Sequence, residues 1–290
     1  MATSLQETGP ITVTPLHPAI GAEIGGVDLS KTLNADMVQT ITQAWHDHTI
    51  LLFRDQDISG EDQLRFAELF GTVAERHIPK DGASHSGSPD WKNLMPISDQ
   101  TDEDGQAIGA LGHGEMWFHS DKCYHPEPHR TSFLYGIDIP TEGGHTKFAS
   151  LYAARENIPD DLRRRLEGAR VMQGYDYAAN ARLNLDIDLD NIFHCSQPIF
   201  VTNPGSGRKA LYVSRLNTMW IEGMDRAESE TILAQLFDIT EDPAIVYEHV
   251  WRPGDLVMWD NLASLHARTD WPDDQTRMLR RCTTLGGPLG

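Results

Sequence analysis

At residues 117–121 the chain reads Trp117-Phe118-His119-Ser120-Asp121, with a histidine and an aspartate separated by one residue. In an extended segment successive side chains point to opposite faces, so His119 and Asp121 project to the same side. His266, much later in the chain, can bring a second imidazole to this face. Two histidines and one carboxylate on one face of a metal leave coordination positions open, as in non-heme Fe(II) sites that react with oxygen. The sequence therefore predicts a metal site at His119, Asp121 and His266.

This pair needs supporting residues, because 13 histidines and 43 acidic residues make a chance His-x-Asp match common. The chain offers three candidates, Thr146, Arg277 and Arg281. An arginine guanidinium is a planar fork that matches a carboxylate, and a threonine hydroxyl can add one more hydrogen bond. Arg277 and Arg281 are four residues apart and face the same way on a strand, so one strand could hold two anions. The open alternative is that both are surface arginines paired with the abundant acids.

Charge and composition exclude several classes of protein. The chain has 290 residues, of which 39% are hydrophobic, and this is enough for a sizeable core. Its formal net charge of −19 repels nucleic acids and anionic membranes. Residues 1–10 do not read as a signal peptide, and the apolar runs are too short to cross a bilayer. Three widely spaced cysteines suit free thiols in a reducing compartment. We therefore expect a cytoplasmic protein without nucleic-acid or membrane partners.

Short apolar runs separated by turn residues predict a mainly β fold. The expected strands cover residues 11–14, 21–29, 49–53, 133–139, 146–149, 199–202, 210–213, 245–251, 256–259 and 278–285. Asn34, Ser59 and Asp225 are expected to cap helices, and residues 150–168 carry further helical signals. Short strands with a few helices outside them favour a β-sandwich or barrel of the jelly-roll type. We expect residues 1–290 to form a single domain.

Two stretches lack periodicity, residues 72–113 and 174–197, where Gly, Ser, Pro and Asp are frequent. Irregular segments of this length in a compact domain are usually functional or disordered. We therefore predict that both are lid segments beside the site.

The pattern of residues resembles the taurine dioxygenase (TauD) and 2,4-dichlorophenoxyacetate dioxygenase (TfdA) family of Fe(II)- and 2-oxoglutarate-dependent oxygenases. The resemblance runs from Gly21-Ala22-Glu23-Ile24-Gly25-Gly26-Val27-Asp28-Leu29, which is similar to the family's N-terminal signature, to Arg277 and Arg281. It implies a double-stranded β-helix, or cupin-like jelly roll, with flanking helices. It also implies Fe(II), 2-oxoglutarate as co-substrate, and O₂.

The resemblance assigns expected roles to individual residues. His119, Asp121 and His266 match the family's iron ligands, and Thr146 with Arg277 matches its 2-oxoglutarate contacts. Arg281 matches a position that holds the anionic group of the substrate in several members, and His77 is expected in the substrate pocket. No other catalytic residue beyond the metal centre is expected.

The implied reaction is hydroxylation of a small anionic substrate such as a sulfonate or carboxylate, with release of succinate and CO₂. Where the oxidised carbon carries a heteroatom, hydroxylation can lead to bond cleavage. A homo-oligomer is expected because it is common in the family. Two other readings stay open from the residues alone. The same ligand set on Zn(II) would suit a metal-dependent hydrolase, and a cupin-like protein could bind a small anion without turning it over.

Overall fold

The computed structural model describes residues 10–75, 93–101, 103, 105, 108–109, 112–176 and 184–290. Within these ranges the α-helices are α1 (Ala35–His48), α2 (Gly60–Glu68), α3 (Leu151–Glu156), α4 (Asp160–Arg165) and α5 (Arg226–Thr240). The strands are β1 (Thr12–Pro15), β2 (Ala22–Gly25), β3 (Ile50–Phe53), β4 (Met95–Ser98), β5 (Met116–His119), β6 (His129–Asp138), β7 (Thr146–Ser150), β8 (Arg170–Tyr175), β9 (Phe193–Pro198), β10 (Phe200–Thr202), β11 (Lys209–Leu211), β12 (Thr218–Ile221), β13 (Val246–His249), β14 (Leu256–Asp260), β15 (Ser264–Arg268) and β16 (Met278–Leu285). None of the helices in these ranges has the length and apolarity needed to span a membrane.

The larger sheet has the strand order β1-β2-β3-β14-β6-β16-β4, and its central strands are buried on both faces. On β3, Leu51 and Phe53 belong to a core cluster that includes residues of α1 and α2. Ile50 and Leu52 alternate with them and join Phe148 of β7 in a second cluster. Because side chains on a strand alternate with a period of two, one apolar strand packs against helices on one face and against another sheet on the other.

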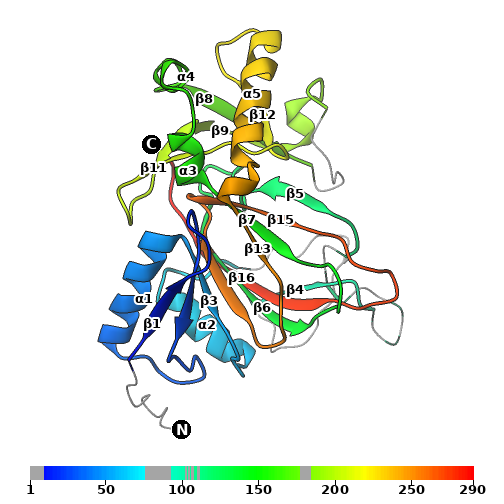
Figure 1. Ribbon diagram of the computed structural model, residues 1–290. Helices are drawn as coiled ribbons and strands as arrows, with labels where there is room; N and C mark the ends of the chain where they lie inside the picture. Colours follow the sequence, from blue (N-terminus) through cyan, green and yellow to red (C-terminus); the bar gives the residue numbers. More distant parts are fainter. Residues whose placement is uncertain are drawn as a thin grey trace.

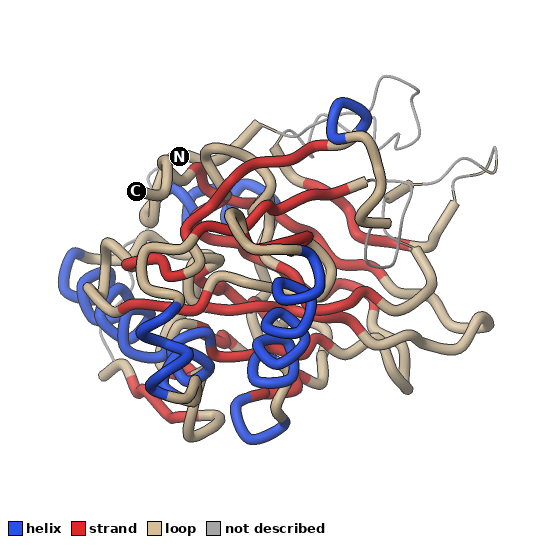
Figure 2. Tube along the Cα trace, turned by 90° about the horizontal axis from the view of Figure 1, so that it is seen from above, coloured by secondary structure: helices blue, strands red, loops and turns tan. Residues whose placement is uncertain are grey.

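The second sheet has the order β13-β7-β15-β5 and faces the first across that inner cluster. In Figure 1, β7, β15 and β5 lie above β6, β16 and β4, while α1 and α2 flank β1 to β3. Figure 2 shows the strands running side by side across the molecule with the helices around them. Two mainly antiparallel sheets, in which only the β2–β3 pair of the described strands is parallel, with helices outside them confirm the predicted jelly-roll class.

The helix caps form as the sequence predicts. The Asn34 side chain accepts a hydrogen bond from the Met37 backbone N–H at the start of α1. Ser59 and Asp62 form a capping box at α2, and Asp225 caps α5. These caps satisfy backbone N–H groups that have no partner within the first turn of a helix.

Residues 150–168, where the sequence carries helical signals, form two short helices, α3 and α4, and Pro159 is the N-cap residue of α4. The structure corrects two local predictions. Strand β4 lies within the stretch 72–113 that was predicted to be irregular, and it pairs with β16 at the edge of the large sheet. Strand β9 lies within the other such stretch, 174–197. Residues 76–92 and 177–183, the remaining continuous parts of these stretches, lie outside the described residues.

A smaller sheet, β12-β8-β9, supports the segment that follows β5. Gln197 of β9 donates hydrogen bonds from Nε2 to the backbone carbonyls of Cys123 and His125 at 3.2 and 2.8 Å. Cys123 is buried, and all three cysteines of the chain are free thiols. This sheet therefore fixes the turn that begins at Asp121.

Candidate metal centre and co-substrate pocket

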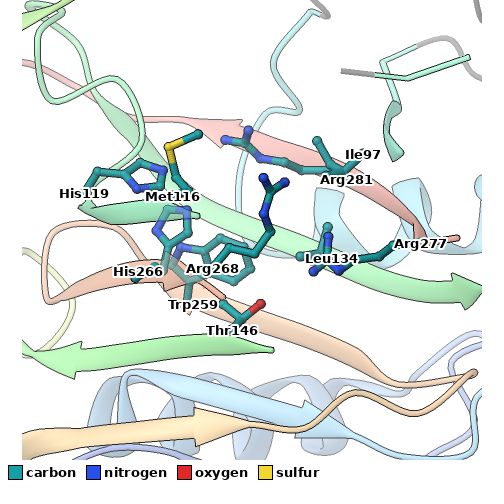
Figure 3. A pocket seen from close by; sticks show the side chains of 11 residues that line it. Ile97, Met116, His119, Leu134, Thr146, Trp259, His266, Arg268, Arg277 and Arg281 are labelled. Atoms are coloured by element: carbon teal, nitrogen blue, oxygen red, sulfur yellow. The ribbon is translucent and has the colours of Figure 1, made fainter. Parts of the chain in front are cut away.

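The two predicted histidine ligands are brought together by strand register. His119 ends β5, and it pairs directly with His266 of β15 in the antiparallel ladder. Their rings have centroids 4.1 Å apart, and Figure 3 shows them side by side at one end of the pocket. Asp121 follows two residues after β5, with Oδ1 3.8 Å from Nε2 of His266. One possible ligand atom from each of the three residues lies within 4.8 Å of the other two.

Both histidines are prepared to act as neutral ligands. Nδ1 of His119 lies 2.8 Å from the backbone carbonyl of Trp117, so this nitrogen carries the proton and donates it. The lone pair is then on Nε2. Burial lowers the pKa of His119, and burial together with repulsion from His119 lowers the pKa of His266 well below its ordinary value. Neutral imidazole is the form that binds a metal ion.

The Asp121 carboxylate has one oxygen occupied by the protein and one directed at the histidines. Its Oδ2 accepts a hydrogen bond from Ser132 Oγ at 2.5 Å and forms an ion pair with an Arg281 terminal nitrogen at 2.6 Å. Burial acts to raise the pKa of Asp121, but the positive charge of Arg281 outweighs it and holds the pKa well below its usual range. The group is therefore a carboxylate with Oδ1 available to a cation.

A buried hydrogen-bond relay stands behind this carboxylate. Asn261 Nδ2 donates to Ser132 Oγ at 2.9 Å, and Trp259 Nε1 donates to Asn261 Oδ1 at 2.9 Å. Ser120 Oγ donates to the backbone carbonyl of Asn261 at 2.6 Å. Because Asn261 lies between β14 and β15, it ties the segment that carries Asp121 to the strand that carries the distal histidine.

A pocket extends from the histidines along the inner faces of the two sheets (Figure 3). It is lined by Ile97, Met116, His119, Leu134, Thr146, Trp259, His266, Ala267, Arg268, Arg277 and Arg281. The structure therefore brings Thr146, Arg277 and Arg281 into one pocket with two of the metal-ligand candidates. His77, the remaining predicted site residue, lies outside the described residues.

Thr146 and Arg277 present hydrogen-bond donors to this pocket. The Thr146 hydroxyl accepts a hydrogen bond from Trp251 Nε1 at 2.9 Å, which orients its oxygen while its own hydrogen has no acceptor among the described residues. Arg277 Nε donates to the Gly144 carbonyl at 3.0 Å. Within the described ranges its two terminal nitrogens donate to no protein acceptor.

Arg277 carries a buried positive charge that a bound anion would stabilise. It is only 2% exposed, and no ion pair to it exists among the described residues. Burial and the nearby Arg268 lower its pKa to about 9, so the guanidinium remains charged at neutral pH. A buried charge without a partner is costly, so a bound carboxylate would stabilise it.

The residues present fit the groups that the sequence implies. Two imidazoles and one monodentate carboxylate are the donor set of a facial Fe(II) site, which keeps coordination positions for other ligands. Arg277 and Thr146 offer donors in the same pocket for the far carboxylate of 2-oxoglutarate. Within the described part of the chain, His119, Asp121 and His266 are the one group of side chains arranged to hold a metal ion.

Comparison with known proteins agrees with this geometry. The family model described as taurine catabolism dioxygenase TauD, TfdA family, matches residues 12–283. The chain belongs to the TauD/TfdA dioxygenase family. It is 35% identical over 286 residues to pentalenolactone F synthase of Streptomyces avermitilis, covering 92% of this chain and 91% of that protein. It is 31% identical to the alpha-ketoglutarate-dependent 2,4-dichlorophenoxyacetate dioxygenase of Cupriavidus pinatubonensis, covering 95% and 98% of the two chains.

Solved structures of similar sequence have the same fold. AAD-2, in complex with Mn(II) and N-oxalylglycine, superposes with a TM-score of 0.78 at 26% identity, covering 97% of this chain and 99% of that one. A taurine dioxygenase from Burkholderia xenovorans gives a TM-score of 0.77 at 26% identity, with 97% and 93% covered. The protein is thus a 2-oxoglutarate-dependent non-heme iron dioxygenase that uses Fe(II), 2-oxoglutarate and O₂. The hydrolase and anion-binding readings lose their support.

Three site residues escaped the sequence analysis. Ser132 and Asn261 act behind Asp121, and nothing in their local sequence marks them. Arg268 lines the pocket itself and is two residues after His266. Its spacing from His266 could have indicated it, because residues two apart on a strand share a face. The sequence analysis did not predict strand β15, so this spacing was not used.

Proposed function

We propose that this TauD/TfdA-family dioxygenase oxidises a C–H bond of a small organic anion, with a carboxylate as the preferred charged group. The observation that carries the proposal is the position of Arg281. Its side chain lines the pocket beside the metal-ligand candidates and is 17% exposed. A cation at this place can hold an anionic group while the rest of the substrate lies near the metal.

The relatives support an anionic substrate. Their names specify 2,4-dichlorophenoxyacetate and (S)-phenoxypropionate, both carboxylates, and a sulfate ester. With Fe(II), 2-oxoglutarate and O₂ bound, the centre supplies the oxidation of a C–H bond, and succinate and CO₂ are released. The part played by this chain is to place the substrate and exclude water. Apolar side chains such as Ile97, Met116 and Leu134 line the pocket between the cations.

The test compares charged and neutral forms of one substrate. A panel of aryloxyacetates, other carboxylates and sulfonates is screened for succinate release, and the best carboxylate is assayed beside its methyl ester. We expect wild type to prefer the carboxylate by about ten-fold or more in kcat/KM, the value of one hydrogen-bonded ion contact. Release of a phenol from an aryloxyacetate would show that oxidation at the carbon beside oxygen leads to cleavage.

The variant Arg281→Met tests whether Arg281 recognises the anionic group of the substrate. Because Arg281 also contacts Asp121, the variant lowers activity on both compounds. The informative quantity is therefore the ratio of the two kcat/KM values, which we expect to fall toward one. An unchanged ratio would assign the recognition of the anion to another residue. Loss of all activity with retained carboxylate binding would leave Arg281 as a support for Asp121 alone.

A further inference from the structure

Arg268 is a third arginine of the pocket, and the reaction described so far gives it no role. It lies on β15, where it shares a face with His266 because the two residues are two apart. Figure 3 shows its side chain extending into the pocket between the histidines and Arg277. Its charge reaches both ends of the pocket, since it contributes to the lowered pKa of His119 at one end and of Arg277 at the other.

Strand register places Arg268 directly beside Thr146, the threonine expected to contact 2-oxoglutarate. In the ladder between β15 and β7, Arg268 is the residue opposite Thr146. Directly opposite residues of antiparallel strands have Cβ atoms about 4.5–5.5 Å apart on the same face. A carboxylate bound by the Thr146 hydroxyl is therefore within reach of the long Arg268 side chain.

Trp271 brings the guanidinium of Arg268 to the end of the pocket where Arg277 lies. The guanidinium carbon of Arg268 is 5.0 Å from the centre of the Trp271 ring, and that of Arg277 is 5.3 Å from the same ring. Arg277 is buried and Arg268 is partly buried, and the positive charge of Arg268 lowers the pKa of Arg277. Two like charges around one ring are stabilised when an anion lies between them.

We propose that Arg268 is a second arginine for the distal carboxylate of 2-oxoglutarate, acting with Arg277 and Thr146. The site would then recognise a doubly charged 2-oxo acid through two guanidinium groups. Arg268 also donates from one terminal nitrogen to the backbone carbonyls of Gly112 and Gly114, at 2.7 and 2.6 Å. Those hydrogen bonds hold the loop before β5. The test must therefore distinguish loss of this structural role from loss of 2-oxoglutarate binding.

The test uses two 2-oxo acids of equal length, 2-oxoglutarate and 2-oxopentanoate, the second lacking the distal carboxylate. Binding of each to Mn(II)-loaded protein is measured by calorimetry, without turnover, for wild type, Arg268→Met and Arg268→Lys. We expect Arg268→Met to weaken 2-oxoglutarate binding by about ten-fold or more, the loss of one hydrogen bond to a charged group. Binding of 2-oxopentanoate should change by less than about three-fold. The preference for the diacid therefore falls.

Arg280→Met is the matched control. Arg280 is also a buried arginine and lies on β16 next to Arg281, but it donates to Gln63 and to the Ile58 carbonyl on the opposite face of the sheet. Its loss should leave the preference for the diacid unchanged. If Arg268→Met weakens both 2-oxo acids equally, Arg268 only anchors the loop and the proposal is overturned.

Arg268→Lys keeps the test decisive should the methionine variant fold poorly. Lysine keeps the charge and loses the planar fork, so we expect a diacid preference between those of wild type and Arg268→Met. A preference equal to that of wild type in both variants would also overturn the proposal. Mn(II) affinity measured in the same titrations shows whether the metal site is intact.

Discussion

The Ser132 hydroxyl should set the metal affinity of this enzyme, although it touches no metal. Its Oγ donates to Asp121 Oδ2 at 2.5 Å and accepts from Asn261 Nδ2 at 2.9 Å, and the residue is fully buried. Ser132→Ala removes a hydrogen bond to a charged group and leaves an Asn261 N–H without its acceptor. Together these losses should lower the free energy of unfolding of the metal-free protein by about 2–4 kcal/mol.

The same change frees the Asp121 carboxylate to rotate. Without Ser132, only Arg281 holds Oδ2, so Oδ1 is directed less firmly toward the histidines. Loss of a group behind a metal ligand typically weakens metal binding by about 10- to 100-fold. We expect that loss for Co(II) bound to Ser132→Ala, measured by anaerobic absorption titration of the metal-free protein. Ser132→Thr, which keeps the hydroxyl, should recover most of the affinity.

Ser229→Ala separates stability from metal binding. Ser229 is a buried serine of α5 whose Oγ accepts a hydrogen bond from the Ile221 backbone N–H at 2.8 Å. Its removal should lower stability by about 1 kcal/mol and leave Co(II) affinity as in wild type. The reasoning fails if Ser132→Ala binds Co(II) as tightly as wild type, or if both serine variants lose the same affinity.

Three further predictions concern pH, the co-substrate and the metal. Burial lowers the pKa of His129 to about 3, so between pH 6.5 and pH 3 the unfolded chain takes up a proton that the folded protein excludes, and stability falls as pH falls. Urea unfolding at pH 7 and pH 5 should show a decrease smaller by about 2 kcal/mol in His129→Gln than in wild type, and equal decreases would refute the assignment. Trp251→Phe removes the donor to Thr146 Oγ1 and should weaken 2-oxoglutarate binding by about three- to ten-fold with Fe(II) affinity retained, as anaerobic titration would show. Chelation followed by addition of Fe(II) at about 100 times its Kd should raise Tm by about 5 °C in wild type and not in His119→Ala, and an equal rise in both would place the metal elsewhere.

Local signals in the sequence predicted the parts of this fold that depend on short-range chemistry. The caps at Asn34, Ser59 and Asp225 formed as expected because a capping side chain binds backbone only two or three residues away. Strand β16 has the predicted bounds, 278–285, and apolar and β-branched residues, which favour strands, make up most of it. Strands β4 and β9 were missed because each lies at a sheet edge, where pairing with a neighbour rather than composition makes the strand.

In the candidate site too, local sequence predicted some residues, while others depend on contacts between distant strands. The spacing of His119 and Asp121, and of Arg277 and Arg281, brought the right residues together, although neither pair lies on a single strand: Asp121 is in the turn after β5, and Arg277 precedes β16. The relay from Trp259 through Asn261 to Ser132 could not be predicted from spacing, because it joins β14 to β6 and depends on which residues become neighbours across strands. Arg268 depends on the register of β15 against β7 in the same way.

The register of β15 is therefore the physical condition that assembles the enzyme. This strand lies between β5 and β7, so His266 faces His119 on one side while Arg268 faces Thr146 on the other. A slip of one residue would turn both side chains to the opposite face and remove a metal ligand and a pocket cation together. The slip is opposed by Leu265, which would exchange a buried apolar position for the polar pocket. Burial of an apolar side chain on one face of β15 thus fixes the position of the reactive groups on the other.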